Sequence, residues 1–188
     1  VNGKEAKINA PIDAMNLGMG LLPDDRKAEG IVADLSVREN IILAIQAKQG
    51  VLKKIPMAKQ CEIADKYIDL LQIKCASRET LIKQLSGGNQ QKVVIGKGLL
   101  TKPKILLLDE PSRGVDIGAK TEVFEIIHDL AEKGLSIIVI SSELKEIMAI
   151  ADRIVVLSNG KKTGELTGDE ITEDTLVRTS YAGLGTGR

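Results

Sequence analysis

The sequence predicts an α/β layer fold that is built on a mainly parallel sheet. Two observations carry this prediction. Dense apolar runs of strand length, at residues 105–108 and 135–141, alternate along the chain with longer segments of helical periodicity. Neither run has the polar alternation of a half-exposed strand, so both are expected to be buried strands, with 105–108 covered on both of its faces.

The first part of the chain predicts one short strand and two helices. Residues 18–27 (GMGLLPDDRK) predict a strand that runs into a charged loop. Residues 34–45 have a mixed apolar period, which indicates a loop and then a short helix. After Pro56, apolar residues recur with the spacing of an amphipathic helix, namely Ile63, Ala64, Tyr67, Ile68 and Leu71. Residues 76–84 are polar and predict a connection.

The stretch QLSGGNQQKVVIGKGLL, residues 84–100, predicts a helix that begins at Ser86. Two glycines follow that serine directly, although a glycine inside a helix costs roughly 1 kcal/mol relative to alanine. Bare N–H groups at the positive end of a helix form a site for an anion. We therefore expect Gly87 and Gly88 to allow an anion to approach the backbone, and Gly88→Asp to repel it while leaving the fold nearly intact.

The last part of the chain predicts two further helices and a hairpin. Residues 117–134 have helical periodicity and finish at Gly134, which is typical of a helix C-terminus. A shorter helix is expected at 142–152. The dipeptide Asn159-Gly160 lies between two strand-like runs and predicts a β-hairpin.

Composition excludes several classes of function. Among 188 residues the formal net charge is zero, which argues against a general nucleic-acid binder. No apolar run approaches the roughly 20 residues that span a bilayer. Cys61 and Cys75 form no CxxC pair and the chain has one histidine, His128, so a Cys/His metal site is not expected. We interpret both cysteines as reduced, partly buried thiols, and His128 as a helix-surface residue.

Two acids close the apolar run at 105–108. Asp109 and Glu110 are followed by Pro111, and ligands of open α/β sheets bind beyond the carboxyl ends of strands. Such a pair can hold Mg²⁺ and polarise a water molecule. A strand that simply ends in solvated acids has the same pattern, so the pair alone leaves both interpretations open.

Several motifs in a fixed order resolve this ambiguity. LSGGNQQK (85–92), ILLLDEPSRGVD (105–116) and VISSELKEIMAIADRIVVLSNGK (139–161) resemble the signature, the Walker B strand with its D-loop, and the switch region of an ABC-transporter ATPase domain. With PDDRK and LSVREN added, the chain resembles the second ATPase domain of fused two-domain importers of simple sugars. The resemblance implies a P-loop NTPase-like (RecA-like) sheet with an inserted helical sub-domain.

The resemblance implies a role for each matching residue. Glu110 polarises the attacking water, and Ser142 stands at the switch position. Asp109 and Asp24 position Mg²⁺. The residues implied to contact ATP are Ser86, Gly87, Gly88, Asn89 and Asp116. Because the family's signature closes over the γ-phosphate held by an opposing ATPase domain, that domain is an implied partner. Membrane permease subunits are implied as further partners, and a sugar-binding protein as an indirect one. The resemblance places this chain at the cytoplasmic face of the membrane and implies no nucleic acid as a partner.

The sequence also departs from the family pattern. No stretch matches the P-loop, GxxxxGK[ST], so the chain is interpreted as a domain whose N-terminal part is missing, and the isolated chain is expected to hydrolyse no ATP. Asp24 replaces the usual Q-loop glutamine, Ser142 the switch histidine and Arg113 a D-loop serine. Asn89 replaces the commoner glutamine of the signature. The changes at Asp24, Ser142 and Arg113 put the hydrolytic competence of the domain in doubt.

Four segments are expected. Residues 1–34 end the N-terminal core and Q-loop region, 35–83 form the helical sub-domain, 84–166 the ATPase core, and 167–188 a C-terminal helix and tail. Two alternatives stay open: a vestigial, non-catalytic ABC fragment that supplies only the signature in trans, and a non-transport ABC protein of translation or DNA repair, whose basic arm or coiled-coil insertion is not seen.

The absent P-loop strand also leads to an expectation about the sheet. In the family this strand is expected to lie beside the strand 105–108. Without it, the strand 105–108 would lack a neighbour, which would uncover apolar side chains and promote self-association. The side chains expected to be uncovered are Leu106, Leu108, Ile138 and Val139.

Overall fold

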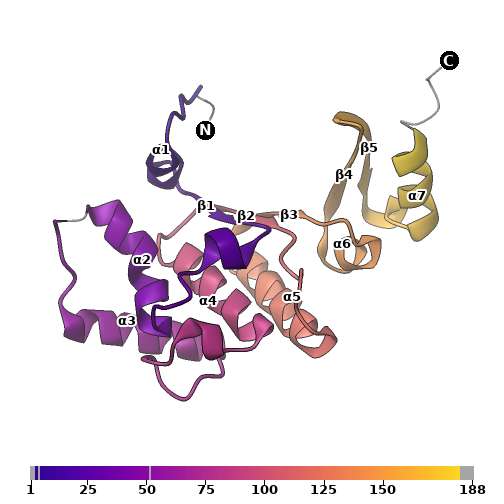
Figure 1. The fold of residues 1–188 in the computed structure, drawn as a ribbon. Helices are drawn as coiled ribbons and strands as arrows, with labels where there is room; N and C mark the ends of the chain where they lie inside the picture. The colour runs from indigo at the N-terminus through magenta and orange to yellow at the C-terminus, as the bar shows by residue number, and fades with distance from the viewer. Residues whose placement is uncertain (1–2, 4, 51, 183–188) are drawn as a thin grey trace. The chain divides into compact units, whose positions relative to one another are not determined.

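The computed structural model describes residue 3, residues 5–50 and residues 52–182. The chain divides into two compact units, which consist of residues 1–140 and residues 141–188. The first unit holds a three-stranded sheet and four longer helices, and the second holds a hairpin with two helices (Figure 1). Within these described residues, no helix is both long enough and apolar enough to cross a bilayer.

The sheet of the first unit is parallel throughout. Its strands are β1 (Met19–Leu22), β2 (Ile105–Asp109) and β3 (Ser136–Ile140), in the order β1-β2-β3. Leu21, Leu107 and Ile138 lie side by side in register. The expected parallel sheet is confirmed, but the expectation that β2 lacks a neighbour is wrong. β2 is the central strand, and β3 is an edge strand of this sheet.

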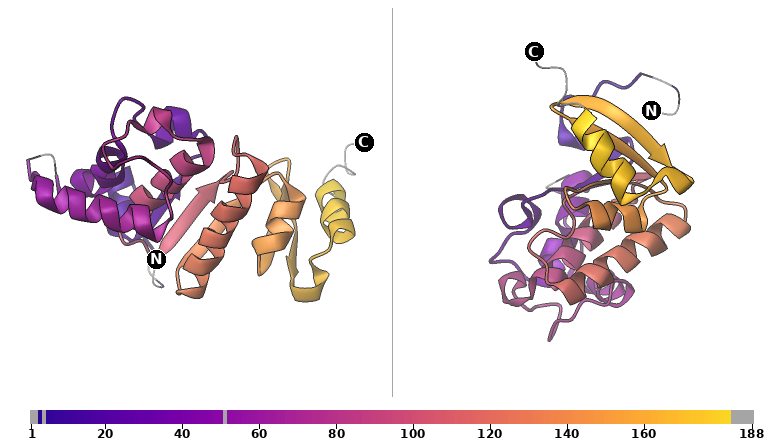
Figure 2. Two further views of the ribbon diagram at one scale, coloured as in Figure 1. Left: turned by 90° about the horizontal axis from the view of Figure 1, so that it is seen from below. Right: turned by 90° about the vertical axis from the view of Figure 1, so that its right-hand side faces the viewer.

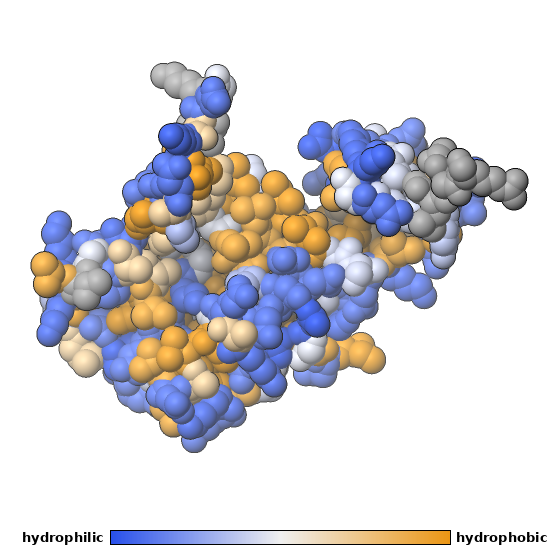
Figure 3. Space-filling model, turned by 45° about the horizontal axis from the view of Figure 1, so that its top comes forward, coloured by the Kyte–Doolittle hydropathy of each residue, from blue (hydrophilic) through white to orange (hydrophobic). Residues whose placement is uncertain are grey.

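The two faces of the sheet are covered differently. Helices α4 (Gly87–Leu99) and α5 (Ile117–Glu132) pack on one face, as Figures 1 and 2 show, and there Leu106 and Leu108 are 0% exposed. On the other face Leu21 is 63% exposed, Ile138 51% and Ile140 54%. Hydrophobic side chains gather on this side of the molecule (Figure 3).

These burials correct two expectations. Leu106 and Leu108 are fully buried rather than uncovered, because α4 and α5 pack on them. The strand β2 is buried on one face and only half-buried on the other. Ile138 is exposed as expected, whereas Val139 is half-buried against the core.

Two long helices lie between β1 and α4 along the chain. α2 (Val37–Gln49) begins at a capping box, in which Ser36 and Glu39 bond to each other's backbone N–H groups. It runs for 13 residues, longer than the short helix expected. α3 (Met57–Leu70) follows the predicted amphipathic pattern. Buried Arg38 of α2 donates two hydrogen bonds to Glu79, at 2.8 and 3.0 Å, and thereby ties α2 to the segment that leads to α4.

Three short turns of helix were not expected from the sequence. α1 (Pro11–Asn16) precedes β1, a π-helical turn spans Arg26–Gly30, and a 3-10 turn spans Ile82–Gln84. The side chain of Asp25 accepts from the N–H groups of Lys27 and Ala28, both at 3.0 Å, and so caps the π-helical turn. A turn of this kind replaces the charged loop that was predicted after β1.

The second unit is built around a hairpin. β4 (Arg153–Ser158) and β5 (Lys161–Thr167) pair antiparallel, and the turn residues Asn159 and Gly160 have φ angles of 50° and 73°. The predicted hairpin is therefore confirmed. α6 (Leu144–Ile150), a 3-10 turn (Gly168–Glu170) and α7 (Glu173–Tyr181) complete the unit. Its core consists of Ile154, Val156, Leu166 and Leu176.

Candidate functional site

The acids predicted from the sequence lie at the carboxyl end of the sheet. Asp109 is the last residue of β2, and Glu110 follows it with a φ of 44°. A positive φ is uncommon for a residue with a side chain and concentrates at functional sites. The N–H of Glu110 donates to the carbonyl of Ile140 at 2.8 Å, which fixes the turn against the end of β3.

Asp24 reaches the same edge, because it follows β1. Its carboxylate forms an ion pair with the guanidinium of Arg113, and this hydrogen bond is the main reason that the pKa of Arg113 is raised. The other carboxylate oxygen of Asp24 is buried without a hydrogen-bond partner. Asp24 and Arg113, which both depart from the family pattern, therefore neutralise each other's charge.

Arg26 is a residue of this site that the sequence analysis missed. It is 7% exposed, and its guanidinium donates to the carbonyls of Arg113 and Gly114, the latter at 2.9 Å. Burial lowers the pKa of Arg26. The motif PDDRK was noted in the sequence, but nothing local in it indicated that Arg26 would reach a loop 87 residues away.

The start of α4 has the predicted cap. Ser86 accepts a hydrogen bond from the N–H of Asn89, and the amide group of Asn89 donates to the Ser86 hydroxyl at 2.9 Å. The side-chain oxygen of Asn89 also accepts from the N–H of Lys74 at 2.7 Å. Both ends of the Asn89 amide are thus engaged within the chain, and they orient Ser86 at the helix terminus.

Both signature glycines are in close contact with other elements. A Cβ on Gly87 would lie 2.7 Å from the guanidinium of Arg26 and 2.8 Å from the carbonyl oxygen of Gly114. A Cβ on Gly88 would lie 2.4 Å from the Cβ of Ala119 in α5. The expectation that Gly88→Asp leaves the fold nearly intact is therefore wrong, because any side chain there would overlap α5.

An ion pair between a buried lysine further along α4 and a partly exposed glutamate was also missed. Lys92 is 2% exposed, and its ammonium group lies 2.6 Å from a carboxylate oxygen of Glu122 in α5. It also donates to the carbonyl of Gln72 at 3.2 Å. The hydrogen bonds from Lys92 and then Lys74 lower the pKa of Glu122 to about 2. The pair fixes the position of α4 on α5.

The remaining predicted residues have separate positions. Asp116 is the N-cap of α5 and accepts from the N–H of Ala119 at 3.0 Å. Ser142 is an exposed residue of the second unit, just before α6. Its neighbour Ser141 accepts from the N–H of Glu143 at 3.1 Å. The predicted roles of Asp116 and Ser142 toward a nucleotide stay predictions.

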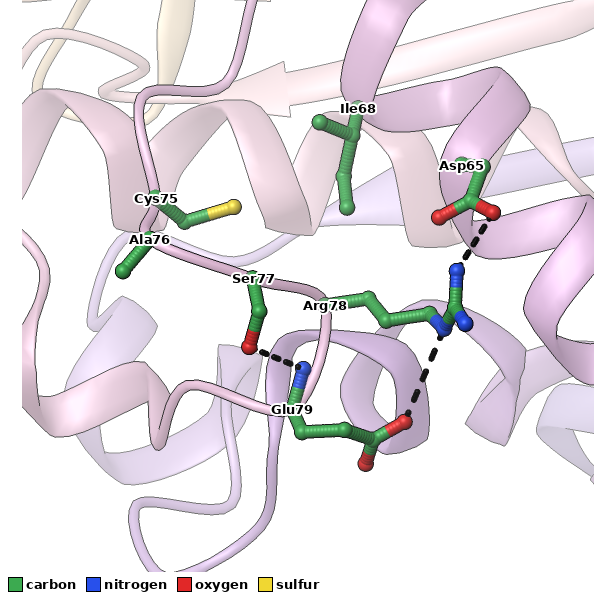
Figure 4. Close-up of a pocket in the computed structure, with 7 residues that line it drawn as sticks. All are labelled: Asp65, Ile68, Cys75, Ala76, Ser77, Arg78 and Glu79. Carbon is green, nitrogen blue, oxygen red and sulfur yellow. Dashed lines mark hydrogen bonds and ion pairs between the residues drawn. The ribbon is translucent and has the colours of Figure 1, made fainter.

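A depression elsewhere in the first unit has a different chemistry. It lies between α3 and the connection to α4 (Figure 4) and is lined by Asp65, Ile68, Cys75, Ala76, Ser77, Arg78 and Glu79. Arg78 and Asp65 form an ion pair of 2.6 Å across it, and burial raises the pKa of the Cys75 thiol. None of the predicted site residues lines this depression.

The donor groups at the sheet edge are compatible with Mg²⁺ in the presence of a nucleotide. In the part of the chain that the structure describes, no three His, Cys, Asp or Glu side chains form a metal cluster. Mg²⁺ sites of nucleotide enzymes need only one or two carboxylates, because phosphates and waters supply the other ligands. Asp109 fits that donor set, whereas Arg113 would compete with a metal ion for Asp24.

Comparison with known proteins agrees with this arrangement. The family model described as ABC transporter matches residues 1–113. The galactofuranose transporter ATP-binding protein YtfR of Escherichia coli (strain K12) is 46% identical over 177 residues, which cover 94% of this chain and 35% of that protein. The ribose import ATP-binding protein RbsA of Caldanaerobacter subterraneus is 44% identical and covers 97% of this chain and 37% of that protein. The chain thus spans about a third of the length of these relatives.

Solved structures agree at the level of the fold. A nucleotide-free ATP-binding cassette from an ABC transporter superposes with a TM-score of 0.76 at 23% identity, over 93% of this chain and 72% of that chain. A dimeric ATP-binding cassette bound to ADP and Pi gives a TM-score of 0.67 at 21% identity, over 79% of this chain and 62% of that chain. The predicted fold class is confirmed by these likenesses.

Proposed function

Because the chain belongs to the ABC transporter family, we propose that it forms part of the ATP-binding subunit of an importer for a simple sugar. One observation carries the proposal. The start of α4, with Ser86 and Gly87, lies directly against the loop that follows the acids of β2. The names of two relatives, a galactofuranose transporter ATP-binding protein and a ribose import ATP-binding protein, support a simple sugar as the substrate class.

The geometry supports a division of roles among the residues. Ser86 and the N–H groups of Gly87 and Gly88, at the positive end of α4, would bind an anion, and we assign them to the γ-phosphate held by an opposing domain. Glu110 orients and deprotonates water at the end of β2. When bound, ATP with Mg²⁺ supplies the phosphoryl group and the charge that Asp109 faces. Ser142 and Asp116 keep their proposed places in the switch and the D-loop.

The proposed partners follow from the same assignment. A second ATPase domain would complete the nucleotide site, and permease subunits would contact the helical part that contains α2 and α3. We place the subunit at the cytoplasmic face of the membrane, and a sugar-binding protein would be an indirect partner. A non-catalytic fragment that supplies only the signature in trans is the alternative, and the pairing of Asp24 with Arg113 favours it, since Asp24 is then occupied.

The experiment that tests the proposal uses a longer protein that joins this chain to a P-loop. Glu110→Gln keeps the shape of the side chain but removes the base, so ATP hydrolysis and sugar uptake in vesicles should fall by about 100-fold or more, while ATP binding persists. Glu125→Gln, an exposed change on α5, is the control and should leave the rate unchanged. Normal hydrolysis in Glu110→Gln would contradict the catalytic role of Glu110, whereas a wild-type protein that hydrolyses no ATP would favour the non-catalytic alternative.

A further inference from the structure

Three segments far apart in the sequence meet at the guanidinium of Arg26. The residue itself begins the π-helical turn after β1. Its two terminal nitrogens donate to the carbonyls of Arg113 and Gly114, in the loop that follows Glu110. The same guanidinium lies against Gly87, where an added Cβ would be only 2.7 Å away. Arg26 is therefore in contact with both the acid-bearing loop and the first turn of α4.

The loop is held from a second direction by its own side chain. Arg113 reaches back to Asp24, two residues before Arg26. The turn at 24–26 and the loop at 113–114 are thus joined twice, once through the side chain of each arginine. A planar guanidinium donates through a fixed fork, so two bonds to adjacent carbonyls restrict both the distance and the orientation of the loop.

The environment of Arg26 is unusual for a cation. Its side chain is buried, and its Nε has no hydrogen-bond partner among the described residues. Its partners on the loop are carbonyl oxygens, and the neighbouring carboxylate of Asp25 offsets part of the cost of burying the charge. Burying a charge on such terms is costly, and burial lowers the pKa of Arg26.

We propose that Arg26 is a positioning residue, which fixes the loop bearing Glu110 against the first turn of α4. Glu110, the proposed base, and the phosphate-facing end of α4 are thereby set in one relative position. On this basis Gly87 is required for packing, because only glycine leaves room for the guanidinium and for the carbonyl of Gly114. The positional part of the inference stands on contacts alone, and only its consequence for hydrolysis rests on the proposed function.

Amide hydrogen exchange on this chain tests the positional part. The N–H groups of Arg113 and Val115 donate within the loop, at 3.0 and 3.1 Å, and report its opening. Arg26→Gln should speed exchange at both by about tenfold or more, with β2 amides unchanged, because only the loop is released. Arg26→Lys, which keeps one donor group, should restore part of the protection. Arg78→Gln, which breaks an ion pair in the helical part, is the control.

Two results would overturn the inference. One is unchanged exchange at Arg113 and Val115 in Arg26→Gln. The other is an equal increase throughout Leu106–Leu108, which would mean that Arg26 supports the whole unit rather than the loop. A double-mutant cycle adds a check, since Gly87→Ala should perturb the loop less in the Arg26→Gln background than alone. Strict additivity of the two changes would count against the contact.

A kinetic measurement on the longer protein tests the consequence for hydrolysis. Arg26→Gln should lower kcat by about tenfold while KM for ATP changes little, because the variant misplaces the carboxylate of Glu110 without removing a contact to ATP. An unchanged kcat would overturn the positioning role in catalysis. A wild-type protein without any ATPase activity would instead contradict the proposed function, and the exchange measurement would still decide whether Arg26 holds the loop.

Discussion

The contact between Gly88 and Ala119 decides how closely α4 and α5 can approach. An added Cβ on Gly88 would lie 2.4 Å from the Cβ of Ala119, a distance that requires one helix to move. Gly88 is buried, so a substituted side chain cannot turn away into solvent. The glycine pair of the signature therefore serves packing as well as the anion site that the sequence indicates.

We predict that Gly88→Ala lowers the free energy of unfolding by about 1–3 kcal/mol, the usual cost of overpacking. Urea denaturation measures the change. Gly118→Ala is the matched control, because a Cβ there would have only an ordinary contact of 3.6 Å. Adding Ala119→Gly to Gly88→Ala should recover part of the loss, although a helical glycine itself costs about 1 kcal/mol. Purely additive losses would contradict the contact.

The pair of Lys92 and Glu122 makes stability depend on pH at the acid end. The pKa of Glu122 falls from 4.5 to about 2 in the folded chain. A lowered carboxyl pKa contributes stability that is present above 4.5 and is lost as the pH falls toward 2. Glu122 is partly exposed, with 39% of its side chain accessible, so solvent reduces the size of this effect.

We predict that Glu122→Gln flattens the fall in stability between pH 4.5 and about 2 and lowers stability at neutral pH. The variant leaves the ammonium of buried Lys92 without its carboxylate, which is destabilising. Denaturation midpoints across the pH range give the comparison with the wild type. Glu125→Gln on the same helix should keep the wild-type slope, and a parallel slope for Glu122→Gln would show that the pair has no share in it.

At the scale of elements, β2 and β3 differ in how their backbones are paired. β2 has a neighbour on each side, whereas β3 pairs only with β2 in this sheet. The N–H of Ser136 donates to Lys104, so along a parallel strand the N–H groups of Ile138 and Ile140 also face β2. Those of Ile137 and Val139 then face away from the sheet, at an open edge.

We predict that the amides of Ile137 and Val139 exchange with solvent about 100-fold faster than those of Leu106 and Leu108, because no strand of this sheet accepts from them. Hydrogen exchange resolved by residue, at low protein concentration, makes the measurement. Equal and strong protection in both strands would contradict this prediction, and it would show that the outer edge of β3 is covered in solution.

At the scale of the whole molecule, an uncovered apolar face adjoins this open edge. Leu21, Ile138 and Ile140 are each more than half exposed on the face opposite α4 and α5. Contiguous apolar surface beside unpaired backbone groups is a template for association. The sequence analysis expected association for a related reason, but it placed the open edge at β2 rather than β3.

We predict that the chain self-associates as its concentration rises, and that Ile138→Lys weakens the association by placing a charge on this face. Sedimentation velocity over a range of concentrations measures both. Leu52→Lys is the matched control, because Leu52 is 97% exposed and lies in the loop between α2 and α3. A wild-type chain that stays monomeric at every concentration would show that this face does not promote association.

The sequence by itself determined the α/β class, the strands predicted at 105–108 and 135–141, and several ends of elements. These features depend on signals within a few residues of each other: apolar runs, the cap at Ser86, Gly134 after a helix, and Asn159-Gly160 in a hairpin. It also identified Asp109 and Glu110 as the acids at the end of a strand. Local steric and hydrogen-bonding preferences are encoded locally, so one sequence is enough to find them.

Only the tertiary structure decided which strand lies at the edge, which face of the sheet is uncovered and what the glycines contact. Each of these depends on residues that are distant along the chain, as with Arg26 and Gly114 or Lys92 and Glu122. An apolar run is the same whether one or both of its faces are covered, because coverage depends on which helices pack there. Likewise, glycine is compatible with a phosphate or with a neighbouring helix, and only the positions of Arg26 and Ala119 show which contacts Gly87 and Gly88 make.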